Sequence, residues 1–177
     1  MNDLNGKIQR HLLGGNESKV NEKRGGEKMN FTEENILLNV ERATKEELLQ
    51  FISEYALEIG VATNVKEVME DFLQREKEVS TGFTHGIAIP HAKSVAVTKC
   101  FVLYIRTKEG IDWGTLDESA VTDVFAVFVP KENSSALHLK VISSLAEELI
   151  EPEFIEVIRC LNTSSELANY LNKKLRK

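Results

Sequence analysis

The chain has 177 residues, of which 42% are hydrophobic and 28% charged, a composition typical of a soluble globular protein with one domain-sized core. Its net charge of −6 at pH 7 argues against a nucleic-acid partner, because phosphate contacts need clustered lysine and arginine. We expect a cytoplasmic protein, since the sequence has neither a membrane-spanning apolar run nor a secretory signal pattern.

The first 29 residues differ from the rest in composition. Residues 1–29 contain two Gly-Gly pairs, little apolar content and no sustained periodicity, which predicts a disordered amino-terminal tail. Residues 30–177 are then the single folded domain. An alternative is that the tail is not translated, because residues 24–27 (RGGE) can be encoded by a purine-rich run resembling a bacterial ribosome-binding site just ahead of Met29. The intact mass of the native protein distinguishes the two.

A strand and a helix are predicted at the start of the folded part. Residues 35–40 (NILLNV) form a short apolar run that is typical of a strand. Thr44 and Glu47 make a capping box, and apolar residues at helical spacing follow it. Gly60 is the expected end of this helix.

A second helix and a loop come next. Asn64 and Glu67 repeat the start signal of the first helix, and the apolar pattern that follows runs out near Glu78. Residues 80–86 are rich in turn formers and predict a loop. Residues 87–89 (IAI) are a brief apolar run, which predicts a short strand.

The second half of the chain contains two longer strands and three helices. Residues 100–106 (CFVLYIR) and 123–129 (DVFAVFV) are almost uninterrupted apolar runs, as expected for strands covered on both faces, with a turn at residues 108–110 between them. Three helices follow: the first is capped by Ser134 or Ser135 and marked by apolar residues at 142, 145, 146 and 149, the second starts from Pro152, and the third from a capping box at residues 163–166. Helices therefore flank the strands at both ends of the sequence, which predicts an α/β fold with a mixed sheet sandwiched between helices.

A histidine stands at a position suited to chemistry. His91 follows Pro90 directly at the end of the run 87–89. Proline fixes its own φ angle and lacks a backbone donor, so we expect the strand to end in a rigid turn there. Such a turn presents His91 at the rim of the sheet, where α/β proteins tend to keep their sites. A histidine that follows a proline is more often structural than functional, so a functional role for His91 depends on other suitable residues in the sequence.

Two other residues complete a possible phosphoryl site. His138 lies in the predicted first turn of a helix, where the partial positive charge favours an anion. Arg75 lies near the end of the second helix, and arginine forms bidentate hydrogen bonds with phosphate oxygens. Taken singly, His138 suits a satisfied core histidine and Arg75 a solvated surface group. Together with the neutral imidazole of His91 as nucleophile, they suffice for a phosphohistidine carrier that needs no cofactor.

Other kinds of site are disfavoured. A metal site needs a third ligand beside His85 and His91, and the sequence offers no clear one nearby. The glycine-rich loops that bind nucleotide phosphates and the nucleophile elbow of hydrolases are also missing from the sequence. We therefore expect the phosphoryl group to come from another protein and expect no bound metal.

A family resemblance supports this interpretation. Residues 75–93 (REKEVSTGFTHGIAIPHAK) closely resemble the signature of the enzyme IIA (EIIA) components of the bacterial sugar phosphotransferase system, fructose–mannitol type. The later segment 136–145 (ALHLKVISSL), which contains His138, resembles the segment with the second histidine of that family. The resemblance extends from about Phe31 to Leu175.

The resemblance implies a mechanism and partners. It implies that His91 accepts a phosphoryl group from the histidine phosphocarrier protein HPr and passes it to a cysteine of enzyme IIB. The resemblance also implies that enzyme IIB passes the group on for sugar uptake through the membrane enzyme IIC, which is on a separate chain. His138 and Arg75 match residues that stabilise the phosphoryl group, while Ser80 and Thr81 match the S-T-G turn that shapes the pocket and binds substrate. An alternative with the same motif is a regulatory EIIA of the nitrogen-related branch, which acts by phosphorylation-dependent protein binding.

Overall fold

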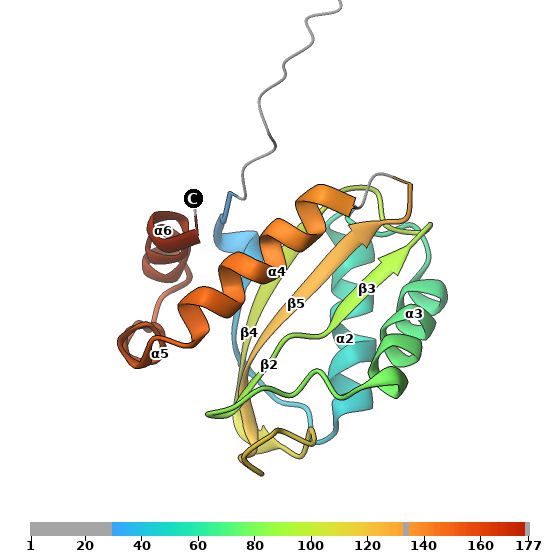
Figure 1. The fold of residues 1–177 in the computed structure, drawn as a ribbon. Helices are drawn as coiled ribbons and strands as arrows, with labels where there is room; N and C mark the ends of the chain where they lie inside the picture. Colours follow the sequence, from blue (N-terminus) through green and yellow to red (C-terminus); the bar gives the residue numbers. More distant parts are fainter. Residues whose placement is uncertain (1–29, 133–134, 176–177) are drawn as a thin grey trace, which may run out of the picture.

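The structure, a computed structural model, describes residues 30–132 and 135–175, and of residues 135–138 it describes the backbone alone. The predicted tail at residues 1–29 lies outside the described residues. Within the described part, no helix is long and apolar enough to cross a membrane. One sheet lies between two layers of helices (Figure 1), which confirms the predicted α/β fold class.

Every helix and strand expected from the sequence is present, and one further strand and a short 3-10 helix, η1, are added. In chain order the elements are η1 (Glu33–Asn35), β1 (Ile36–Val40), α2 (Lys45–Glu58), α3 (Val65–Glu78), β2 (Ile87–Ala88), β3 (His91–Ser94), β4 (Phe101–Ile111), β5 (Val121–Pro130), α4 (Ser135–Leu149), α5 (Pro152–Cys160) and α6 (Ser164–Leu175).

The sheet is mixed, with the order β1-β4-β5-β2, and β3 pairs with β5 as well. β4 and β5 are antiparallel, whereas β1 is parallel to β4, and both β2 and β3 are parallel to β5. β2 and β3 follow one another along a single edge of β5, with Ile87 opposite Asp123 and His91 opposite Val127. The edge strand that carries His91 is thus held in register by the central strand β5.

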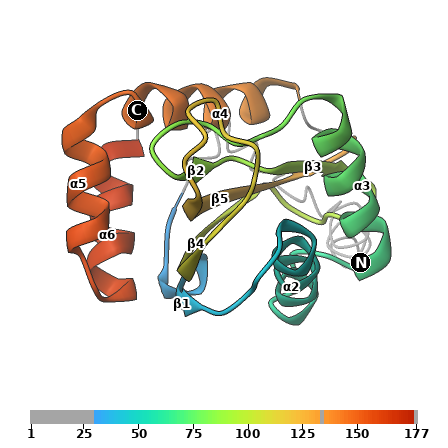
Figure 2. The ribbon, with the colours of Figure 1, turned by 90° about the horizontal axis from the view of Figure 1, so that it is seen from below.

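The two long strands bury alternate residues in two separate cores. Leu103 of β4 and Ala126 of β5 belong to the core formed with α2 and α3. Tyr104 and Phe125, their neighbours in the sequence, belong to the core formed with α4, α5 and α6. Figure 2 shows the two helical layers on opposite sides of the sheet. Because both faces are covered, the strands carry nearly continuous apolar runs.

The predicted helix starts are confirmed by their caps. Thr44 accepts a hydrogen bond from the backbone N–H of Glu47 at 3.1 Å, and Asn64 accepts one from Glu67 at 3.2 Å. Each cap satisfies a donor that the first helical turn leaves without an intrahelical partner. α3 therefore begins and ends where the sequence indicates, and its last turn contains Arg75.

The sequence prediction around Pro90 was wrong in one respect. The chain does not stop pairing there: β2 ends at Ala88, and the new strand β3 begins at His91. Proline lacks an N–H group, but the Pro90 carbonyl still accepts a hydrogen bond from the backbone of Val127 at 2.9 Å. Pro90 therefore loses only the hydrogen bond that a backbone N–H would donate. His91 is the first residue of a strand rather than part of a terminal turn.

The turn predicted at residues 108–110 was also wrong. β4 runs through this segment to Ile111, and its register with β5 shifts between Arg106 and Ile111. A side chain at Gly110 would place its Cβ 2.7 Å from the Cβ of Ala120. Gly110 thus marks a close approach of two paired strands within an irregular ladder rather than a reversal of the chain.

Candidate functional site

The structure brings His91 and Arg75 into direct contact. α3 packs beside β3, so that the last turn of the helix lies next to the first residue of the strand. Arg75 Nε–H donates a hydrogen bond of 2.8 Å to Nε2 of His91. Both side chains are partly buried. Two of the residues predicted from the sequence therefore form a pair at the edge of the sheet.

The two nitrogens of the His91 imidazole have different partners. Nδ1 lies 3.1 Å from the carbonyl oxygen of Ile89, which can only accept, so Nδ1 carries the proton. Nε2 accepts from Arg75, which can only donate, so Nε2 carries the lone pair. This tautomer makes Nε2 the nucleophilic atom of the ring.

The surroundings keep His91 neutral. Partial burial is the main cause that lowers the pKa of His91 below its usual value, and the charge of Arg75 acts in the same direction. The Ile89 carbonyl and the carboxylates of Glu76 and Glu78 oppose this decrease without overcoming it. The imidazole is therefore mostly unprotonated at neutral pH, as a nucleophile must be.

Arg75 is held at a second point. Its Nη1 donates to the carbonyl oxygen of Val79 at 2.9 Å. Val79 is the C-cap residue of α3, so the guanidinium bridges the end of its own helix and the ring of His91. An arginine fixed in this way presents a preorganised positive charge at the imidazole.

Residues 79–81, called below the turn after α3, follow the helix with a bend at Val79. The hydroxyl groups of Ser80 and Thr81 in this turn bond to groups other than His91. Ser80 Oγ lies 3.2 Å from the Glu76 carboxylate and 3.0 Å from the Trp113 carbonyl. Thr81 Oγ1 donates to Glu76 at 2.5 Å and accepts from the indole of Trp113 at 3.2 Å. Their predicted role in binding substrate remains a prediction, whereas their bonds identify a turn fastened to α3.

Glu76 is the residue at this site that the sequence interpretation missed. Its side chain is 7% exposed, and its carboxylate forms an ion pair of 3.3 Å with Lys45. A signal for it was present: a glutamate in the last turn of a helix, followed by Ser-Thr just after the helix ends, is placed to accept from that turn. Its position beside Arg75 makes it part of the site.

His138 is the fourth residue of α4, which confirms its predicted place in the first turn of a helix. Its side chain lies outside the described part of the structure, so the proposed contact with a phosphoryl group stays a prediction. Among the described residues, no group of three His, Cys, Asp or Glu side chains is placed to hold a metal ion.

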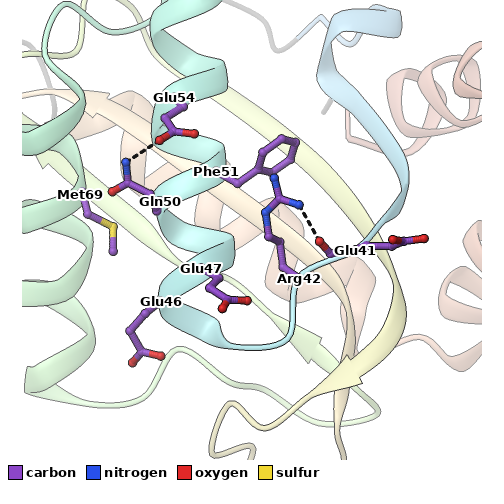
Figure 3. A pocket seen from close by; sticks show the side chains of 8 residues that line it. All are labelled: Glu41, Arg42, Glu46, Glu47, Gln50, Phe51, Glu54 and Met69. Atoms are coloured by element: carbon purple, nitrogen blue, oxygen red, sulfur yellow. Dashed lines mark hydrogen bonds between the residues drawn. The ribbon is translucent and has the colours of Figure 1, made fainter.

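A surface pocket lies elsewhere, on the side of α2 (Figure 3). The guanidinium of Arg42 lies 4.4 Å from the ring centroid of Phe51, and it donates to the carbonyl of Glu41 at 2.6 Å. The pocket is lined by Glu41, Arg42, Glu46, Glu47, Gln50, Phe51, Glu54 and Met69. It shares no lining residue with the His91 site.

Comparison with known proteins gives a consistent result. Residues 29–174 match the model of the family described as "Phosphoenolpyruvate-dependent sugar phosphotransferase system, EIIA 2". The chain is 34% identical over 140 residues to a PTS system fructose-like EIIA component of Escherichia coli, which covers 79% of this chain and 93% of that protein.

Two solved structures resemble the fold closely. The nitrogen regulatory protein IIA-Ntr from Neisseria meningitidis has a TM-score of 0.74 and 28% identity, and the match covers 80% of this chain and 95% of that one. The mannitol enzyme IIA from Escherichia coli, solved in complex with phosphorylated enzyme IIB, has a TM-score of 0.63 and 26% identity. That match covers 82% of this chain and 96% of the other.

Proposed function

The chain belongs to the EIIA 2 family of the phosphoenolpyruvate-dependent sugar phosphotransferase system, and we propose that it is a phosphoryl carrier with His91 as its phosphorylated residue. The observation that carries the proposal is the pair of bonds to the imidazole. Ile89 fixes the proton on Nδ1, and Arg75 faces the lone pair of Nε2. A neutral nucleophile beside a fixed positive charge is what acceptance of a phosphoryl group requires.

The transfer step follows from this geometry. The lone pair of His91 Nε2 attacks the phosphorus of a phosphohistidine on the donor, HPr. A new N–P bond forms as the N–P bond of the donor breaks, and the donor nitrogen recovers the electron pair. The Nδ1–H bond to Ile89 then stabilises the positive charge that the substituted ring acquires.

The positive groups act on the phosphoryl oxygens. As the N–P bond forms, the Arg75 donors move from the Nε2 lone pair to the oxygens of the phosphoryl group. The short movement is possible because the phosphoryl group lies on the side of the ring that Arg75 already faces. His138, at a helix amino terminus, is the second stabilising group in this proposal. Ser80 and Thr81 shape the pocket from the turn after α3.

The acceptor in this proposal is a cysteine of enzyme IIB, which serves sugar uptake by the membrane enzyme IIC. The support is the likeness to the mannitol enzyme IIA, whose structure was solved with phosphorylated enzyme IIB bound. A thiolate is a strong nucleophile, and the phosphoimidazole is a good leaving group, so the onward step needs no cofactor.

The test is phosphorylation in a reconstituted system. With phosphoenolpyruvate, enzyme I and HPr, the protein is expected to gain the mass of one phosphoryl group in an acid-labile, base-stable form. His91→Asn removes the nucleophile, and the gain should disappear. His85→Asn is the matched control: His85 is exposed and has a φ of +58°, which asparagine tolerates. Full phosphorylation of His91→Asn would refute the assignment.

A second candidate is regulation in the nitrogen-related branch, favoured by the likeness to IIA-Ntr at a TM-score of 0.74. The phosphorylated protein mixed with purified fructose- and mannitol-type enzyme IIB distinguishes the two. Rapid loss of the phosphoryl group to a IIB cysteine supports the carrier. Retention of the group on His91, with phosphorylation-dependent binding of another protein, supports the regulator.

A further inference from the structure

We propose that Glu76 is a positioning residue for phosphoryl transfer: its carboxylate holds one turn, and two carbonyl groups of that turn fix the partners of both imidazole nitrogens of His91. The inference rests on the proposed function of His91 and adds a residue to it.

The Glu76 carboxylate is almost fully buried and fully engaged. Its two oxygens accept from the backbone N–H of Thr81 at 3.1 and 3.2 Å and from the Thr81 hydroxyl at 2.5 Å. Lys45 lies 3.3 Å away and compensates the charge. A buried carboxylate is costly unless it is paired and hydrogen-bonded. With these bonds satisfied, it holds residues 80–81 in one conformation.

The first carbonyl of the turn orients Arg75. The Val79 carbonyl, one peptide unit before Ser80, accepts from Arg75 Nη1 at 2.9 Å. The direction of this carbonyl is set by the conformation of the turn that follows it. Because Arg75 Nε donates to His91 Nε2, the turn determines where the guanidinium meets the ring.

The second carbonyl orients Ile89. The Thr81 carbonyl accepts from the backbone N–H of Ile89 at 2.9 Å. The carbonyl of the same Ile89 faces Nδ1 of His91 at 3.1 Å. The turn held by Glu76 therefore reaches both sides of the imidazole, through Arg75 on one side and Ile89 on the other.

Trp113 packs against the turn and forms hydrogen bonds with both Ser80 and Thr81. It is 1% exposed, and its indole N–H donates to Thr81 Oγ1, while its carbonyl faces Ser80 Oγ and Lys45 Nζ. The turn is thus packed against a rigid aromatic group and cannot relax freely when the carboxylate is altered. Displacement of the nucleophile by about 1 Å typically costs on the order of 10²-fold in rate.

The main variant is Glu76→Gln, which keeps the shape but replaces one acceptor oxygen with a donor that faces the Thr81 N–H or hydroxyl. We expect the maximal rate of phosphorylation by HPr to fall on the order of 10-fold or more, with the half-saturating HPr concentration unchanged. Glu70→Gln is the matched control, because Glu70 lies on the same helix in an exposed ion pair with Lys66. A Glu76→Gln rate equal to that of Glu70→Gln overturns the inference.

A second pair of variants keeps the carboxylate intact. Thr81→Val removes the hydroxyl that donates to Glu76 and accepts from the Trp113 indole, and it should lower the maximal rate, whereas Thr81→Ser keeps both bonds and should restore it. Equal rates in the two variants contradict the inference. This pair also guards against a general folding defect in Glu76→Gln, since the backbone bond to Thr81 is retained in both.

The nitrogen NMR signals of His91 separate this inference from the proposed function. The unphosphorylated wild type should show a single tautomer with the proton on Nδ1, and Glu76→Gln should show a mixture of tautomers. An unchanged single tautomer in Glu76→Gln overturns the positioning role. If the wild type is not phosphorylated at all, the proposed function fails while this spectroscopic result still decides the role of Glu76.

Discussion

At the scale of single residues, the site depends on which atoms of His91 are occupied. One backbone carbonyl and one guanidinium determine the tautomer, and burial with the nearby Arg75 charge determines the protonation state. These effects act together: the ring is held neutral, with its lone pair aimed at a fixed positive group. In the proposed function, His91 is therefore ready to react before a phosphoryl donor arrives.

The lowered pKa of His91 gives a prediction about pH. Because the neutral ring reacts, the phosphorylation rate should fall to half only below about pH 6.5, the usual histidine pKa. Arg75→Gln removes a charge that disfavours the protonated ring, so its half-point should move to higher pH. Its plateau should also fall on the order of 10²-fold with the loss of a phosphoryl-stabilising donor.

The measurement is the rate of mass gain between pH 5 and pH 8, with HPr at saturation. Lys77→Gln is the control, because it removes one exposed charge from the same helical turn. Taking the ratio of each variant to the wild type cancels the pH response of the donor, and the Arg75→Gln ratio should decrease as the pH falls. A ratio that stays constant or increases at low pH contradicts the assigned electrostatic role.

At the scale of elements, α3 and β3 together bring Arg75 and His91 into contact. α3 brings Arg75 and Glu76 on its last turn, and β3 is held along the edge of β5 by His91 and the residues after it. Phe72 of α3 packs edge-on against Phe128 of β5, with ring centroids 5.3 Å apart. The helix is thereby anchored to β5, the strand that also pairs with β3, so β5 positions both Arg75 and His91.

The cap of α3 can be tested separately from the chemistry. Asn64→Ala removes the side chain that accepts from the Glu67 N–H, and it should lower the free energy of unfolding by about 1 kcal/mol. Asn64→Asp keeps an accepting oxygen and should remain close to the wild type. Urea denaturation followed by circular dichroism measures both. A loss in Asn64→Asp as large as in Asn64→Ala would contradict the capping role.

Local signals predicted most of the elements and failed at two of them. Caps at Thr44 and Asn64 gave the correct helix starts because capping depends on residues adjacent in the sequence. The continuation of pairing after Pro90, and of β4 through Gly110, depends on contacts with β5, which lies 10 or more residues away in the chain. No local pattern contains that information.

At the scale of the whole molecule, a network of charged side chains around the buried Asp123 joins α5 to the sheet. Asp123 of β5 is 1% exposed, and it accepts from Tyr104 at 2.6 Å and from Arg159 of α5 at 2.8 Å. Arg106 lies 3.5 Å from the same carboxylate and donates to the carbonyl of Leu161. Burial, together with the charge of Asp123, raises the pKa of Tyr104, which keeps this hydroxyl a donor.

This network predicts a large effect on stability. Asp123→Ala removes the acceptor of the Tyr104 hydroxyl and of Arg159 Nε and leaves the partly buried Arg106 without its opposite charge, so it should lower the free energy of unfolding by about 3–5 kcal/mol. Asp112→Ala, at an exposed position, should change it by less than about 0.5 kcal/mol. Urea denaturation of the two variants against the wild type is the measurement. Similar values for both would show that the network contributes little.

Hydrophobic periodicity, caps and a continuous motif are local properties, and they were enough to predict the fold class, the family, and His91, His138 and Arg75 as candidate site residues. The folded structure adds that Arg75 faces Nε2, that Ile89 holds the proton on Nδ1, and that the hydroxyls of Ser80 and Thr81 point to Glu76. These features could not be predicted from the sequence, because hydrogen-bond direction, burial and charge at His91 arise from α3, β3 and the turn after α3 meeting in space. Which ring nitrogen carries the lone pair is therefore a property of the packing rather than of the motif.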